Sequence, residues 1–234
     1  MEHTGAHVKP CRWMAPGIEG EPMGKGREFL ESIYALDDDG DVRSFYDGAA
    51  GDYDEVLLAQ VGYVSPTVCA HIMTRFLSNR EAALIDLGCG TGLAGEALTA
   101  LGYKNIEGVD FSTEMLAVAE TRNCYAKLSI ADLNAGTGIP ESSYAAAVSV
   151  GVFGQHVLPA ALDEAIRIVE PGGVFCFSVN ERTFDDYGFR DKVDALSADG
   201  RGTCLSLTKE PYHVNENIDG WVCVLRVGKA ARVR

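Results

Sequence analysis

Short apolar runs alternate along this chain with longer segments whose apolar residues recur at helical spacing. The apolar runs predict strands near residues 82–87, 105–110, 125–130, 144–150 and 173–179. The segments between them predict helices near residues 93–101, 112–122 and 158–170. Because strands that alternate with helices form βαβ units, the pattern predicts a mostly parallel sheet.

The pattern changes after the fifth strand. A polar helical stretch near 184–197 is followed by two β-rich segments, 203–214 and 220–227, joined by a short polar linker. These two segments predict an antiparallel hairpin at the edge of the sheet. Residues 134–143 contain two glycines and a proline, so a loop is expected between the third and fourth strands.

The first predicted strand ends in an acid and a glycine-rich turn. Asp86 is followed by Gly88, Gly90 and Gly92, which allow a sharp turn and let a ligand approach the backbone. Leu93 stands where the dinucleotide fingerprint G-x-G-x-x-G has its third glycine. A carboxylate before the turn repels a pyrophosphate and suits a ligand with positive charge. S-adenosylmethionine (AdoMet) has that character.

Acids also follow the second and third predicted strands. Asp110 lies 22 residues after Gly88, a separation at which an acid accepts hydrogen bonds from ribose hydroxyls in α/β nucleoside sites. Asp132 follows the third strand, within Ala131-Asp132-Leu133. A further motif, Glu170-Pro171-Gly172-Gly173, comes directly before the fifth strand.

In this order, these segments resemble the class I AdoMet-dependent methyltransferases over roughly residues 44 to 228. The resemblance implies a three-layer α/β/α Rossmann-like sandwich with a seven-stranded, mostly parallel sheet and an antiparallel closing hairpin. It implies AdoMet as cofactor, with Asp132 accepting from the adenine amino group. The cofactor-binding residues it implies are Tyr46, Tyr53, Asp86, Gly88, Cys89, Gly90, Gly92, Asp110, Phe111, Met115, Ala131, Asp132, Leu133 and Val150.

Residues 43–61 resemble the helix with which this family often opens, which covers the cofactor and helps to wall the acceptor pocket. The details are most similar to the methyltransferase-like proteins of the Williams–Beuren syndrome chromosome region and related bacterial predicted methyltransferases. We therefore expect a poorly ordered extension (1–26), a helical lid region (27–80) and a methyltransferase core (81–230). Tyr46 and Tyr53 are also compatible with core aromatics of an amphipathic helix, since residues seven apart share a helix face.

Among the five histidines, His156 is the candidate catalytic residue. It follows the fourth strand, where this fold places groups that contact the acceptor, although a structural role is also open. His213 lies in the closing hairpin and is expected to be structural. The acidic run at 37–41 lacks the glycine and glutamate that a calcium loop requires, so we expect a solvated loop and no metal site.

Composition limits the partners and the cellular location that can be expected for this chain. A net charge of −14 and the lack of a basic stripe predict no nucleic-acid partner. No apolar run reaches 18 residues, so no membrane span is expected. Seven scattered cysteines without a C-x-x-C pair suggest a reducing compartment and hence the cytoplasm. A monomer or a homodimer is expected.

The expected activity is in-line transfer of the AdoMet methyl group to a small-molecule acceptor. Three alternatives stay open: an oxidoreductase that uses a dinucleotide, a non-catalytic AdoMet-binding module, and a methyltransferase that acts on a protein. Nucleic-acid amino methyltransferases carry [DNS]-P-P-[YF] after the fourth strand. This chain has Ser149-Val150-Gly151-Val152 there, which disfavours that class.

Overall fold

The structure is a computed structural model that describes residues 24–36 and 39–228. The predicted extension at 1–26 lies outside these residues, except for its last three, and so does the predicted end of the core at 230. Seven strands form one sheet: β1 Leu84–Leu87, β2 Ile106–Asp110, β3 Lys127–Ile130, β4 Tyr144–Phe153, β5 Val169–Asn180, β6 Gly202–His213 and β7 Ile218–Val227.

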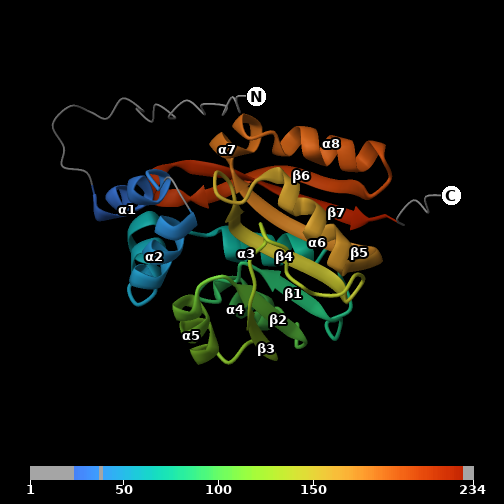
Figure 1. Ribbon diagram of the computed structural model, residues 1–234, viewed down its shortest axis with the longest axis horizontal. Helices are drawn as coiled ribbons and strands as arrows, with labels where there is room; N and C mark the ends of the chain where they lie inside the picture. The colour runs from blue at the N-terminus through green and yellow to red at the C-terminus, as the bar shows by residue number, and fades with distance from the viewer. Residues whose placement is uncertain (1–23, 37–38, 229–234) are drawn as a thin grey trace, which may run out of the picture.

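The strands are ordered β3-β2-β1-β4-β5-β7-β6 (Figure 1). All neighbours are parallel except β7, which runs antiparallel to both β5 and β6. The central strand β1 is buried along its whole length, as expected for a parallel strand with both faces covered. The chain leaves β1 for β2 on one side and returns to β4 on the other, which creates a switch point between β1 and β4.

Helices cover both faces of this sheet. The first layer contains α3 Ser65–Met73 and α4 Leu93–Ala100, whose apolar residues share a core with one face of the strands. The second contains α6 Leu162–Ile168, α7 Glu181–Asp186 and α8 Phe189–Ala198 on the opposite core. Helix α5 Thr113–Thr121 packs on β2 and β3. The predicted three-layer sandwich with its closing hairpin is confirmed.

Local sequence explains where several elements begin. Pro66 stands in the first turn of α3, where its missing N–H has no helical partner in any case. Ser112 caps α5 as predicted, because its Oγ accepts from the backbone N–H of Met115 at 3.1 Å.

Two predicted helices differ from their expected bounds: one is divided and one is shorter. Glycine in the left-handed region (Gly188, φ 77°) divides the stretch predicted at 184–197 into α7 and α8. The helix predicted at 158–170 begins with a 3₁₀ turn, η2 Pro159–Ala161, and ends early because Val169 already belongs to β5.

Three N-terminal segments lie together beside the sheet, at the left of Figure 1: α1 Lys25–Tyr34, α2 Asp39–Ala49 and the π-helix η1 Glu55–Val61. The single helix expected over 43–61 is divided by a turn that includes Gly51 and Asp52. The solvated loop expected at 37–41 is also wrong from Asp39 onward, where α2 begins; residues 37 and 38 lie outside the described residues. A further 3₁₀ turn, η3 Val214–Glu216, joins β6 to β7.

Candidate cofactor and acceptor site

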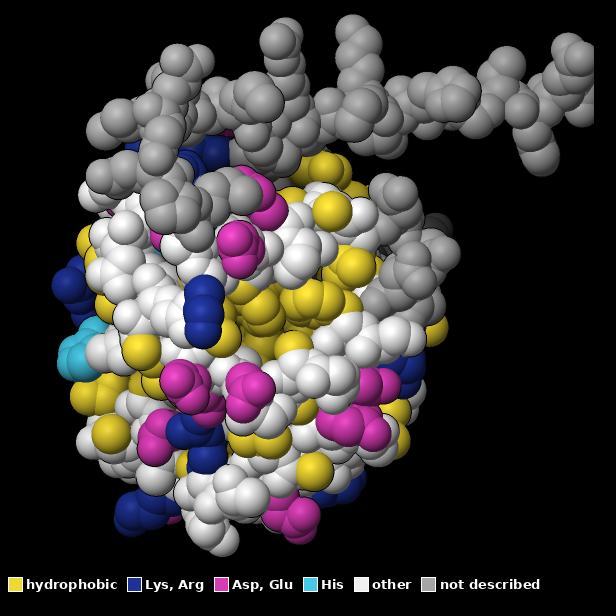
Figure 2. Space-filling model, turned by 90° about the vertical axis from the view of Figure 1, so that its left-hand side faces the viewer, with side chains coloured by type: hydrophobic (Ala, Val, Ile, Leu, Met, Phe, Trp, Pro, Cys, Tyr) yellow, Lys and Arg dark blue, Asp and Glu magenta, His cyan; other side chains and the backbone are white. Residues whose placement is uncertain are grey.

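A cavity of about 430 Å³ opens beside the carboxyl ends of β1, β2 and β4, between these strand ends and the N-terminal helices. This is the switch point at which open α/β sheets bind ligands, and the volume lies in the range of small-molecule sites. Figure 2 shows a hollow lined by hydrophobic side chains on this side of the molecule, with acidic side chains along its margin.

Every residue predicted for the site lines this cavity except Gly92. Gly92 takes φ 93° before α4, and a Cβ there would lie 2.9 Å from the side chain of Arg122 and 3.1 Å from Tyr125. Close packing therefore accounts for this glycine. The structure brings the other predicted residues together, including His156, and their roles remain predictions.

The remaining glycines form a cradle. Gly88 has φ 70°, and a Cβ on it would lie 2.5 Å from Val152, so only glycine fits between the turn and β4. Gly90 has φ 53°, and a Cβ on it would meet no protein atom within 4 Å. The backbone at Gly90 is therefore exposed to the cavity, where a ligand can approach it.

Asp86 is buried at the floor of this cradle. Its Oδ2 accepts a hydrogen bond from the Tyr125 hydroxyl at 2.7 Å, whereas its buried Oδ1 has no partner. Burial raises the pKa of this carboxyl to about 7, the Tyr125 bond lowers it, and the nearby Asp110 carboxyl raises it further. A buried oxygen without a donor fits the ammonium group of AdoMet and does not fit the phosphates of a dinucleotide.

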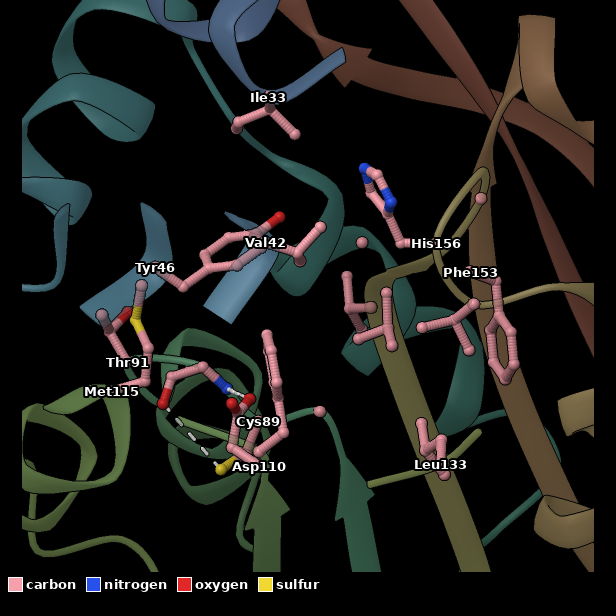
Figure 3. Close-up of a pocket in the computed structure, with 18 of the residues that line it drawn as sticks. Ile33, Val42, Tyr46, Cys89, Thr91, Asp110, Met115, Leu133, Phe153 and His156 are labelled. Carbon is pink, nitrogen blue, oxygen red and sulfur yellow. Dashed lines mark hydrogen bonds between the residues drawn. The ribbon is translucent and has the colours of Figure 1, made fainter. Parts of the chain in front are cut away.

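Asp110 is held in place by the glycine turn itself. Its Oδ2 accepts from the Gly90 N–H at 2.8 Å (Figure 3). Its Oδ1 accepts from the Ser112 N–H at 3.0 Å. Burial raises the pKa of this carboxyl, although both bonds and the Arg43 guanidinium oppose the rise. Each carboxylate oxygen has a second acceptor site, so both can still bind a ribose hydroxyl.

The predicted adenine end lies beside this acid. Phe111 and the buried Met115 and Leu133 supply the apolar surface expected against the ring. The Arg43 guanidinium lies 5.1 Å from the centre of the Phe111 ring and donates to the Phe111 carbonyl. Asp132 lines the cavity, and its Oδ1 accepts from the Asn134 N–H at 2.8 Å.

Several polar contacts attach the lid to the core, and those of Asp47 and Asp54 reach the cofactor end. Asp47 of α2 accepts from the Ser112 hydroxyl at 2.6 Å. Asp54 accepts from the Thr91 hydroxyl at 2.5 Å and pairs with Arg122, whose Nε also donates to the Thr91 carbonyl at 2.6 Å. Both acids therefore join the lid region to the turns at Thr91 and Ser112, which follow β1 and β2.

The two lid tyrosines meet despite the broken helix. The Tyr46 and Tyr53 ring centres are 5.9 Å apart, and the Tyr46 ring is also 5.9 Å from Phe111. Burial, together with nearby acidic groups, raises the pKa of both hydroxyls, so both are neutral at physiological pH. Both tyrosines line the cavity, and Tyr46 places this pair beside Phe111 at the cofactor end.

His156 lies across the cavity from Asp110 and Cys89, on the same side as Ile33 (Figure 3). Its Nε2 is 2.7 Å from Nε2 of Gln155, whose amide also donates to the carbonyls of Ile33 and Tyr34. With the amide nitrogen as donor, His156 Nε2 accepts this bond. Removing a proton from an acceptor with that nitrogen therefore requires Gln155 to move first.

Sequence reasoning missed several residues that line the far end of the cavity: Tyr34, Tyr63, Asn180, Tyr212 and His213. His213 was expected to be structural. A register irregularity between Pro211 and His213 interrupts the alternation of β6, and Tyr212 and His213 are both buried. Periodicity alone gives no sign of this arrangement, because a regular strand turns successive side chains to opposite faces.

Residues 84–173 match the family model described as a methyltransferase domain. The chain therefore contains a methyltransferase domain of the class I AdoMet-dependent type. Its strand order, its glycine cradle and the unpartnered Asp86 oxygen agree with AdoMet, the cofactor of this class. No helix among the described residues is long and apolar enough to span a bilayer.

Curated relatives include human methyltransferase-like protein 27, which is 29% identical over 163 residues, 68% of this chain and 66% of that protein. This confirms the predicted resemblance to the Williams–Beuren region proteins. A malonyl-[acyl-carrier protein] O-methyltransferase of Serratia marcescens is 30% identical over 138 residues, 58% of this chain and 51% of the relative. The matched part of this methyltransferase thus spans less than two thirds of each relative.

A solved structure with a similar fold is the methyltransferase in complex with the Trm112 methyltransferase activator of Haloferax volcanii. Its TM-score is 0.63 at 17% identity, with 82% of this chain and 99% of that chain covered. At this identity the similarity supports the fold alone.

The predicted exclusion of nucleic acid was wrong. The yeast 18S rRNA (guanine(1575)-N(7))-methyltransferase is 42% identical over 72 residues, 30% of this chain and 26% of its own length. Net charge misled the prediction, because it averages over the whole surface and says nothing about the acceptors that relatives of the same domain use.

Proposed function

We propose that this protein transfers the methyl group of AdoMet to a small-molecule acceptor held between the lid and the strand ends. The observation that carries the proposal is the continuity of one cavity, which joins the cradle at Asp86, Gly90 and Asp110 to a chamber walled by lid residues. AdoMet would supply an electrophilic methyl group on a sulfonium. The acceptor atom would bond to the methyl carbon as the carbon–sulfur bond breaks.

The chain's own contribution is placement. Asp110 would orient the ribose and Asp86 the ammonium group, while Tyr46 and Tyr53 keep water away from the methyl group. Proximity in a dry pocket can lower such a barrier by several kcal/mol. An acceptor that loses a proton also needs a group or a water to take it, and His156 is the proposed group.

Calorimetry tests the first half of this proposal, namely which cofactor the site binds. The ligands compared are AdoMet, S-adenosylhomocysteine (AdoHcy), NADH and NADPH. Micromolar binding of the two adenosyl ligands without nicotinamide binding is expected. Binding of a nicotinamide cofactor instead would favour the oxidoreductase alternative.

Transfer of a labelled methyl group tests the second half. Three pools are compared: metabolites, 18S rRNA, and a malonyl-loaded acyl-carrier protein, the last two taken from the names of the relatives. Labelled metabolites are expected. Label only in RNA or protein would replace the small-molecule proposal, and binding without turnover on any pool would favour a non-catalytic module.

The role of His156 is tested by His156→Ala once an acceptor is known. If His156 accepts the proton, its removal should reduce turnover by roughly a hundredfold while AdoHcy affinity stays nearly constant. His71→Ala, at an exposed position of α3, is the matched control. Turnover within a few-fold of wild type between pH 6 and 9 would assign His156 a structural role.

We also propose a reducing, cytoplasmic location. The six cysteines among the described residues are all free thiols: Cys69, Cys89, Cys124, Cys176, Cys204 and Cys223. Cys11 lies outside the described residues. Cell fractionation with the tagged full chain tests this location, and recovery in an oxidising compartment would contradict it.

A further inference from the structure

The cavity has two ends that differ in charge. Its charged carboxylate and guanidinium side chains all belong to the cofactor end. Asp86, Asp110 and Asp132 lie at the ends of β1, β2 and β3, and Arg43 packs on Phe111. The far end, formed by α1, the residues after η1, the loop after β4 and the ends of β5 and β6, is lined by neutral side chains within the described residues.

Aromatic rings dominate this far end. The rings of Tyr63 and Tyr212 are 5.4 Å apart, and the His213 ring lies 5.3 Å from the first and 4.7 Å from the second. Burial raises the pKa of both tyrosines, so their hydroxyls stay protonated and neutral. Gly151 leaves the space that the Tyr63 hydroxyl occupies, since a Cβ there would lie 2.3 Å from that oxygen.

His213 is the unusual member of this cluster. It is 4% exposed, it lines the cavity, and its Nδ1 has no hydrogen-bond partner. Burial lowers the pKa of the imidazole to about 4, so the ring is neutral at pH 7. An unsatisfied buried ring nitrogen destabilises a folded protein, and the tilted and edge-on contacts of this ring with the two tyrosines do not supply a hydrogen bond. Such a group in a binding cavity is consistent with a ligand that completes it.

We propose that this end of the cavity binds the methyl acceptor as an uncharged aromatic ring, and that His213 selects it by hydrogen bonding to its polar group. The inference rests on the proposed function, because it names the acceptor class of that same site. The ring would lie against Tyr63 and Tyr212, whose faces and edges favour aromatic partners. A carboxylate is disfavoured, because burying it without a cation is costly and no lysine or arginine among residues 24–36 and 39–228 lines this end.

A ring of this kind can come from two sources. A phenol or a nitrogen heterocycle can enter the cavity as a free metabolite, and a nucleobase can enter it as part of a nucleic acid. The shared chemistry is the neutral planar ring with a polar edge. The source is separated by comparing guanosine with a guanosine-containing RNA oligonucleotide.

The ligand test uses the AdoHcy complex of the full chain. A panel of uncharged phenols and heterocycles, guanosine included, is titrated by calorimetry, each phenol paired with its carboxylate analogue, such as methyl 4-hydroxybenzoate with 4-hydroxybenzoate. We expect binding by neutral members, at least tenfold tighter than by their charged partners. Equal or tighter binding of the carboxylates, or a panel without any neutral binder, would overturn the proposal. Failure of AdoHcy itself to bind would instead reject the proposed function.

The residue test is His213→Phe, which keeps the aromatic packing and removes both ring nitrogens. We expect AdoHcy affinity within twofold of wild type, a melting temperature equal or higher, and at least tenfold weaker binding of the best neutral ligand. His71→Phe, at an exposed position of α3, is the control and should change none of these. A lower melting temperature with unchanged acceptor binding would make His213 structural. Should this variant not fold, His213→Leu, which also removes both ring nitrogens, provides the same comparison, with weaker acceptor binding again expected.

Discussion

The residues that form the two ends of the cavity are distributed differently along the sequence. The cofactor end is built mostly from residues within 86–133, at the ends of three strands that are adjacent in the sheet, and with Arg43 it holds all the carboxylate and guanidinium side chains among the described residues that line the cavity. The far end collects residues from Leu30 to His213, on elements that are distant in sequence, and it is neutral. A ligand common to a family can be recognised by a short local motif. A ligand particular to one protein is recognised by surfaces that meet only after folding.

The largest effect that tests this contrast is expected for Asp110→Ala. Two hydrogen bonds from ribose hydroxyls to a charged acceptor are worth about 1.5–3 kcal/mol each, so AdoHcy affinity should fall roughly a hundredfold or more. Binding of a neutral aromatic ligand to the far end should change much less. Calorimetry on both ligands measures the difference. Wild-type AdoHcy affinity in a folded Asp110→Ala protein would show that Asp110 does not bind the ribose.

A smaller effect is expected at the lid. Arg122→Met removes the partner of Asp54 and the donor to the Thr91 carbonyl. We expect faster hydrogen exchange over residues 43–61 and about tenfold weaker AdoHcy binding. Arg190→Met, which removes a surface pair with Asp185, is the matched control. In the wild type, exchange in this segment should slow when AdoHcy saturates the site; the same rate with and without ligand would show that this segment is not a lid.

A several-fold effect of pH is expected from Asp86. The folded carboxyl has a pKa of about 7, above its ordinary value of 3.8, so the native state holds a proton that the unfolded chain has released. Stability therefore falls as pH rises from 4 to 7. A ligand ammonium favours the charged carboxylate, so AdoHcy affinity should rise several-fold between pH 6 and pH 8. Asp86→Asn should abolish this rise, and an unchanged slope would assign it to another group.

The smallest effect is expected for Asp132→Ala. Its carboxylate already accepts from the Asn134 N–H, and the adenine amino group would add one further bond. We expect a loss of a few-fold for AdoHcy and almost none for the inosine analogue, which has no amino group. Calorimetry with both ligands is the measurement. Equal losses for the two would show that Asp132 does not contact this edge of the base.

The fold was predictable because its signals are local. The buried strand before Asp86, the cap at Ser112 and the paired β-rich segments at the end each follow from short-range chemistry, and each is found in the structure. The predicted helix over 43–61 failed for a related reason. Gly48 and Gly51 weaken a helix by about 1 kcal/mol each, and the lid instead follows polar contacts to Ser112 and Thr91.

The sequence by itself determined the order of strands and helices, the glycine cradle and the three acids at consecutive strand ends, because each of these depends on neighbours within a few residues. Only the tertiary structure decided that Gly92 serves packing and that the Gln155 amide donates to the carbonyls of Ile33 and Tyr34. It also decided that His213 faces the cavity between two tyrosines. These features depend on contacts between distant segments and on an irregularity in β6. A linear pattern carries no record of such contacts.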